Sequence, residues 1–149
     1  MNLTGIRTDL AQILEQHLLN CRAYAYEPSK VEVPQGGVAV IVQRDPNTYV
    51  DYLQAFSGGL AEVHLILKVL AEQNRDQVPE ELIDKLLSSG STESTSVVDV
   101  LAAFGSTWWN GRIRPDGAQA AGLVGQTTDS GDVQYQSVEV AVTVFVGRT

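Results

Sequence analysis

The residue types best suited to chemistry are scarce in this 149-residue chain, which holds one cysteine and two histidines. His17 and Cys21 are spaced i, i+4, so on a helix they would meet on one face. As a metal pair they lack partners, because His64 is the only other histidine and zinc usually takes three or four strong ligands. As a nucleophile pair they would need an exposed, electropositive setting. The pattern therefore favours structural packing of Cys21 over catalysis.

A second group, Asp45, Asn47 and Asp51, is spaced like the start of a calcium-binding loop. That motif needs Gly at its sixth position and Glu at its twelfth, which here hold Val50 and Phe56. The match fails, and the pattern indicates a turn instead. The sequence also contains no G-x-x-x-x-G-K-[ST] phosphate loop and no G-x-S-x-G nucleophile elbow. We therefore expect no enzyme, no catalytic residues, no cofactor and no metal site.

Aromatic and small polar residues point instead to a surface for assembly. Residues 45–59 are predicted to form an aromatic loop and residues 117–132 a Gly/Thr-rich loop. The adjacent pair Trp108 and Trp109 would point to opposite faces of a strand, so core packing and partner contact both stay open. The candidate interface residues are Tyr49, Tyr52, Phe56, Trp108, Trp109, Thr127, Thr128 and Asp129.

The composition limits the kinds of partner that we expect the chain to bind. It has 10 Lys and Arg residues and 18 Asp and Glu residues, which give a net charge of −8. We therefore do not expect nonspecific binding to nucleic acid or to anionic membranes. A single cysteine excludes a disulfide framework within the chain. We expect no targeting segment and no membrane span, and folding in a cytosol with Cys21 reduced.

The elements that must position these residues follow from hydrophobic periodicity and turn signals. Apolar residues spaced three or four apart predict a helix over 4–21, with Cys21 on its core face and Arg7 on its outer face. Two further helices are predicted over 79–88 and 97–104, the latter capped by Ser96 and ended by Gly105. Strands are predicted over residues 23–26, 38–44, 62–70, 107–113 and 133–146, with a turn at Pro115–Gly117.

This order predicts one domain over residues 1–149. Its fold class should be α+β, with helices packed on one face of a mainly antiparallel sheet. The strand 38–44 is expected to be central, because it is apolar on both faces.

The chain as a whole resembles the tail terminator proteins of long-tailed (siphovirus-type) bacteriophages. The resemblance rests on an opening helix (IRTDLAQILEQHL), a Tyr24-x-Tyr26-x-Pro28 stretch, the strand VAVIVQ and the loop DPNTYVDY. It continues with Gly58-Gly59 before the strand AEVHLILKVL, a helix pair and the terminal strand VEVAVTVFV.

That resemblance implies a tail-terminator-like fold and a structural virion protein without enzymatic activity. Such proteins form a ring, typically a hexamer, at the head-proximal end of the tail tube. The ring ends tube polymerisation, joins the tail to the head connector and lets DNA pass through its channel without sequence-specific binding. The implied partners are other copies of the chain, the tail tube protein and the head-closure protein, with assembly in the host cytoplasm.

Two alternatives stay open at the level of sequence. One is another neck or minor tail protein, such as a head-closure or adaptor ring. The other is a small soluble binding module or enzyme that uses the aromatic loop as a pocket.

Overall fold

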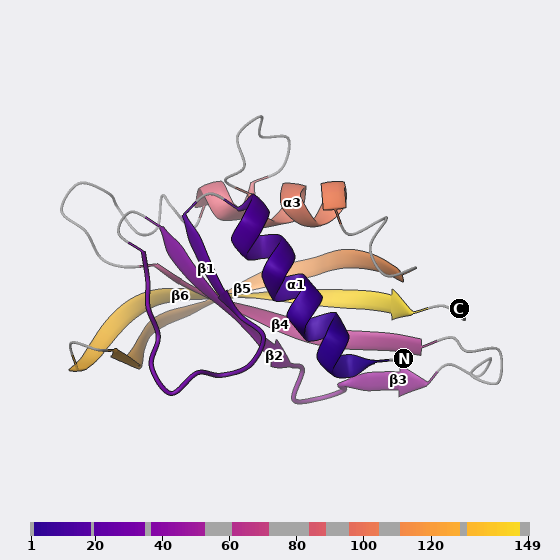
Figure 1. Ribbon diagram of the computed structural model, residues 1–149, viewed down its shortest axis with the longest axis horizontal. Helices are drawn as coiled ribbons and strands as arrows, with labels where there is room; N and C mark the ends of the chain where they lie inside the picture. The colour runs from indigo at the N-terminus through magenta and orange to yellow at the C-terminus, as the bar shows by residue number, and fades with distance from the viewer. Residues whose placement is uncertain are drawn as a thin grey trace.

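The computed structural model (Figure 1) describes residues 2–18, 20–34, 37–52, 61–71, 84–88, 96–104, 111–128 and 131–146. Two helices in this part are α1 (Leu3–His17) and α3 (Val97–Phe104). The strands are β1 (Cys21–Tyr24), β2 (Val38–Arg44), β3 (Val50–Tyr52), β4 (Ala61–Ala71), β5 (Gly111–Thr128) and β6 (Gly131–Val146).

The strands form one sheet in the order β1-β2-β4-β6-β5, and β3 pairs with β4 off this path. β1 and β2 are parallel, and every other pairing given for these strands is antiparallel. The fold is therefore α+β with a mixed, mostly antiparallel sheet, as the sequence predicted.

The core lies between the sheet and the two helices. Alternating residues of β4, including Val63, Leu65 and Leu67, face the helices and are at most 1% exposed. Ile6, Leu10 and Leu14 of α1 lie in the same cluster, together with Val97, Val100 and Leu101 of α3. Figure 1 shows α1 and α3 on the same side of the sheet, so the predicted one-sided packing is confirmed for the described helices.

The ends of the helices follow ordinary capping rules. The side-chain oxygen of Asn2 accepts a hydrogen bond from the Gly5 amide at 3.0 Å and caps α1. The Ser96 hydroxyl accepts from the Asp99 amide at 3.3 Å at the start of α3. The prediction of a helix over 97–104 with Ser96 as its cap is confirmed.

We call the sheet face opposite α1 and α3 the outer face. At one end, the irregular segment that contains Val31 covers this face instead of a helix. Val31 is buried there against Ala39, Ile41, Leu70 and Tyr135. The Glu32 amide donates a hydrogen bond to the Tyr24 hydroxyl at 3.0 Å, which holds this segment on the sheet. The rest of the outer face carries Glu62, His64, Ile66 and Lys68 of β4, which are only half-buried.

The first helix is shorter than its periodicity predicted. It ends at His17, and Cys21 instead begins β1, so His17 and Cys21 do not share a helix face. Asn20 has a φ of 51°, which turns the chain between the two elements. Arg7 was predicted to face solvent, and this was wrong: the side chain is 8% exposed because backbone carbonyls receive its hydrogen bonds.

The prediction of a loop over 117–132 was also wrong. Residues up to Thr128 belong to β5, and Pro115–Gly117 is a bulge inside that strand rather than a turn. A second irregularity lies between Ala120 and Gly122, whose φ of 70° suits glycine. These bulges explain how a strand at the edge of the sheet accommodates Pro and Gly residues that normally signal loops.

The remaining predictions differ in outcome. The strands predicted at 38–44, 62–70 and 133–146 are confirmed as β2, β4 and β6. The loop predicted over 45–59 contains the short strand β3, which pairs with β4. Of the helix predicted over 79–88, residues 84–87 are helical and 79–83 lie outside the described residues. Gly105 and residues 107–110 of the predicted strand 107–113 also lie outside them.

Candidate functional site

The candidate interface residues that the structure describes lie at opposite ends of the sheet. Tyr49 directly precedes β3 and Tyr52 is its last residue, and β3 pairs with the first residues of β4. Thr127 and Thr128 are the last two residues of β5, which extends there past the end of β4. The structure therefore does not bring them together within one chain. Phe56, Trp108, Trp109 and Asp129 lie outside the described residues.

The two tyrosines differ in exposure. Tyr52 is 55% exposed, whereas Tyr49 is half-buried and packs against the core. The Tyr49 carbonyl oxygen accepts a hydrogen bond from the His64 amide at 2.8 Å, which holds the segment before β3 against β4. The Asp45 side chain accepts from the Asn47 amide at 2.9 Å, so the predicted turn at this position is confirmed.

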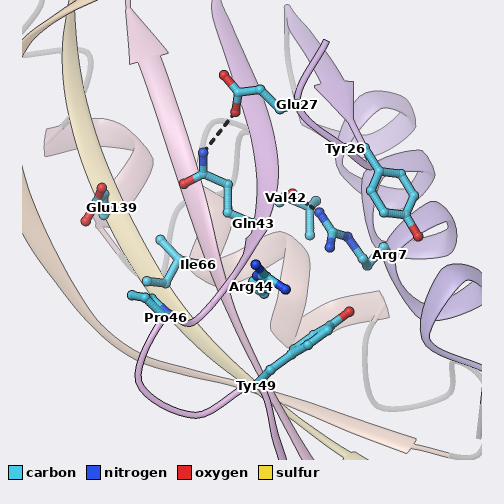
Figure 2. Close-up of a pocket in the computed structure, with 10 residues that line it drawn as sticks. All are labelled: Arg7, Tyr26, Glu27, Val42, Gln43, Arg44, Pro46, Tyr49, Ile66 and Glu139. Atoms are coloured by element: carbon cyan, nitrogen blue, oxygen red, sulfur yellow. Dashed lines mark hydrogen bonds between the residues drawn. The ribbon is translucent and has the colours of Figure 1, made fainter.

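A groove of about 650 Å³ lies beside Tyr49, where α1 and the segment after β1 meet β2. Figure 2 shows Arg44 near its centre, the Arg7–Tyr26 pair on one side, and Pro46 and Ile66 on the other. At one end Gln43 donates a hydrogen bond to the Glu27 carboxylate at 3.0 Å. The groove thus combines two guanidinium groups with aromatic and aliphatic walls.

Arg7 connects the walls of this groove, although its only signal in the sequence is an arginine one position from the apolar stripe of α1. Its Nε donates to the Ala25 carbonyl at 2.8 Å, and its Nη2 donates to the Val42 carbonyl at 2.7 Å. Its guanidinium lies 4.0 Å from the centre of the Tyr26 ring. Because β1 ends before Val42, Arg7 supplies a donor to the part of the β2 edge that β1 does not pair.

Cys21 is a poor nucleophile in this structure. Burial and, to a lesser extent, the nearby Glu15 carboxylate raise the pKa of its thiol to about 12. The thiolate is the reactive form, so at neutral pH Cys21 stays protonated. Its packing against the core supports the structural role that the sequence favoured.

The hairpin formed by β5 and β6 extends past the end of β4. β4 ends at Ala71 opposite Gln136, and five further residue pairs, from Val124–Tyr135 to Thr128–Gly131, continue the hairpin beyond that point. Figure 1 shows this end curling away from the rest of the sheet. β5 is also an outer strand of the sheet order, so within the described residues its second edge has no strand beside it. Such an edge is a template for pairing with another chain.

One group of metal-ligating side chains comes together on the outer face. Within the described residues, Asp51, Glu62 and His64 have ligand atoms that all lie within 4.8 Å of one another. The sequence-based expectation of no metal site considered Cys/His clusters and a calcium loop that includes Asp51, but not Asp51 together with Glu62 and His64. Glu62 and His64 alternate on one strand, but Asp51 joins them only through the pairing of β3 with β4.

Comparison with known proteins adds no family or relative. No protein-family model matches the chain, and no curated protein shows significant sequence similarity to it. Among the described residues, none of the helices has the length and apolar character needed to cross a membrane.

Proposed function

We propose that the chain is a tail terminator of a long-tailed phage, a non-enzymatic ring subunit at the head-proximal end of the tail tube. The ring would end tube polymerisation and join the tail to the head connector, with DNA passing through its channel. The observation that carries this assignment is the β5–β6 hairpin, whose last five residue pairs extend past β4. The sequence resemblance to tail terminators supports the same assignment.

Two features favour contact between copies of the chain: the β5–β6 hairpin extends past β4, and β5 is the last strand of the sheet. Backbone donors and acceptors on the outer edge of β5 can be satisfied by a strand of a neighbour. The opposite edge of the sheet is formed by β1, where Glu15 of α1 accepts from the Ala23 amide at 3.4 Å. Contact of the β5 edge of one copy with a different surface of the next copy is head-to-tail, and head-to-tail contacts that close give a ring.

The negative charge of the chain suits a conduit for DNA. With a net charge of −8, a ring would multiply that charge around its channel. Like charge keeps the phosphate backbone from adhering to the wall, so DNA would slide rather than bind. We expect the channel wall to be acidic, and a ring structure with a basic wall would contradict this part of the proposal.

Light scattering and electron microscopy of the purified chain test ring formation. We expect a closed ring of one stoichiometry, either in solution or on the ends of tail tubes added to the sample. A monomer at every concentration that also fails to bind tube ends would contradict the proposal. Ring formation without binding to tube ends would favour a head-closure or adaptor protein instead.

A further inference from the structure

Three side chains on the outer face hold their potential metal-ligand atoms close together. The proposed assembly of subunits into a ring gives no reason for this arrangement. Asp51 of β3 is the register partner of Glu62 on β4, so the two side chains lie side by side on one face. His64 follows two residues later on β4 and therefore points to the same face as Glu62. The side chains of Glu62 and His64 are only about one quarter exposed, at 26% and 25%.

A buried hydroxyl fixes the orientation of the imidazole ring. The Thr143 hydroxyl of β6 donates its one proton to the Asp116 carboxylate. Its oxygen lies 3.3 Å from Nδ1 of His64 and can only accept there, so we assign the ring proton to Nδ1. Thr143 is 1% exposed, so the hydroxyl itself is shielded from water.

A further contact supports Asp116, the carboxylate that accepts from Thr143. Arg114 Nε donates to the second Asp116 oxygen at 2.7 Å, and its guanidinium lies 5.0 Å from the centre of the Phe145 ring. Arg114 therefore supports the carboxylate that orders Thr143. A histidine whose Nδ1–H is held by such partners is the usual arrangement behind a metal-binding Nε2.

The other nitrogen of the His64 imidazole, Nε2, lies beside the carboxylate groups of Glu62 and Asp51. With the proton on Nδ1, Nε2 of neutral His64 carries a lone pair, and it lies 3.4 Å from Oε2 of Glu62. The Asp51 carboxylate completes a set of three acceptor groups within 4.8 Å. Three such acceptors stabilise one another only when a cation lies between them, either a proton on His64 or a metal ion.

The spacing suits a metal ion. Ligands about 2.0–2.1 Å from a tetrahedral zinc ion lie about 3.4 Å from one another. The 3.4 Å between Nε2 of His64 and Oε2 of Glu62 matches that value. Asp51 is exposed, so its carboxylate can rotate toward the same point. A donor set with imidazole nitrogen selects zinc and its first-row neighbours over calcium and magnesium, which prefer oxygen alone.

We propose that Asp51, Glu62 and His64 bind one divalent transition-metal ion of the zinc class, with Thr143 positioning the imidazole. Three protein ligands leave a fourth position for water or for a group from a partner. Such an ion would link β3 to β4 and order the exposed Tyr52 beside Asp51. This site does not depend on ring formation.

Calorimetric titration of the full chain with zinc chloride tests the site. We expect one ion per chain with a dissociation constant in the micromolar range or below. His64→Ala should weaken binding at least about 100-fold, and Glu62→Gln, which keeps the shape of the side chain, should also weaken it strongly. His17→Ala and Glu139→Gln are matched controls that remove the other histidine and another half-buried acid of the outer face, and both should bind like the original chain.

The positioning role of Thr143 has its own test. Thr143→Val removes the hydroxyl at nearly constant volume and should weaken zinc binding about 10–100-fold, whereas Thr143→Ser should restore it. Cobalt absorption spectra of these variants report the ligand geometry directly. No zinc binding by the original chain, or binding that His64→Ala and Glu62→Gln leave unchanged, would overturn the site.

Discussion

The guanidinium of Arg7 donates a 2.7 Å hydrogen bond to the carbonyl oxygen of Val42 and so ties α1 to the part of β2 that β1 does not pair. A second bond from the same group reaches the Ala25 carbonyl, and the Tyr26 ring covers the guanidinium. A residue that periodicity alone places on the outer side of the helix thus joins three segments of the chain.

Replacing Arg7 with methionine should destabilise the fold markedly. The substitution keeps most of the apolar stem but leaves two carbonyl groups without their charged donor. Hydrogen bonds to charged groups contribute about 1.5–3 kcal/mol each, so the two bonds predict a loss of about 3–6 kcal/mol in the free energy of unfolding. Urea denaturation measures this loss. Arg44→Met in the same groove is the control, and as an exposed site it should change stability by about 0.5 kcal/mol or less. Equal effects of the two substitutions would show that Arg7 has no special structural role.

Gly37 is required by a close approach between two segments. A Cβ atom at this position would lie 2.0 Å from the Asn20 carbonyl oxygen, which accepts the Val38 amide hydrogen bond at 2.9 Å. Gly37→Ala should therefore separate the starts of β1 and β2 and cost about 1–3 kcal/mol, as other overpacked sites do.

Gly125→Ala is the matched control for this steric effect. A Cβ atom at Gly125 meets nothing within 4 Å, so the variant should unfold at the same denaturant concentration as the original chain or slightly above it. If the two alanine variants proved equally stable, the close contact at Gly37 would not exist in solution.

Cys21 gives the chain a specific dependence on alkaline pH. An unfolded thiol loses its proton above about pH 8.5–9, whereas the folded thiol keeps it until its pKa of about 12. Between these values the folded state binds more protons than the unfolded state, so this group makes stability fall as pH rises. The slope approaches about 1.4 kcal/mol per pH unit.

Comparing the original chain with Cys21→Ala isolates that contribution from other alkaline titrations. The difference in unfolding free energy between the two proteins should shrink from pH 9 to pH 11, because only the original chain loses the thiol contribution. In parallel, a thiol reagent at pH 8 should react with half-buried Cys21 of the folded protein much more slowly than with the unfolded chain, because the folded thiol is almost entirely protonated. Equal reaction rates for the folded and unfolded protein would contradict the raised pKa of this thiol.

Shortening the β5–β6 hairpin should separate folding from assembly. Gly125 and Gln134 are register partners, so Asn-Gly can replace residues 126–133 as a two-residue turn. This change spares Tyr135, which is 5% exposed and packs in the outer-face cluster. We expect a melting temperature within a few degrees of the original and loss of ring formation by light scattering. Rings that survive the shortening would exclude the hairpin from the contact between subunits.

The regular strands and α3 were predictable because their signals are local. The alternation in β4 and the apolar run of β2 both express burial directly, and Ser96 marks the start of α3. The residues of β5 were not predictable in the same way, since its glycines and Pro115 read as loop while bulges make them compatible with an edge strand. Pairing with β6 outweighs local propensity there.

The sites depend on contacts that no local pattern encodes. Asp51 reaches Glu62 through strand pairing, and Thr143 reaches His64 from a strand 79 residues away in sequence. Arg7 finds its acceptors on β2 and on the segment after β1. Residue types identified the aromatic segment around Tyr49, but only the fold shows that it lies at the opposite end of the sheet from Thr128.

Cryo-electron microscopy of tailed phage particles that carry this chain tests the central claim most directly. The account predicts a closed ring of the chain between the last ring of the tail tube and the head connector. It also predicts that neighbouring subunits meet through β5 and the β5–β6 hairpin around an acidic channel. Density for the chain elsewhere in the particle, or its absence from the particle, would contradict the assignment.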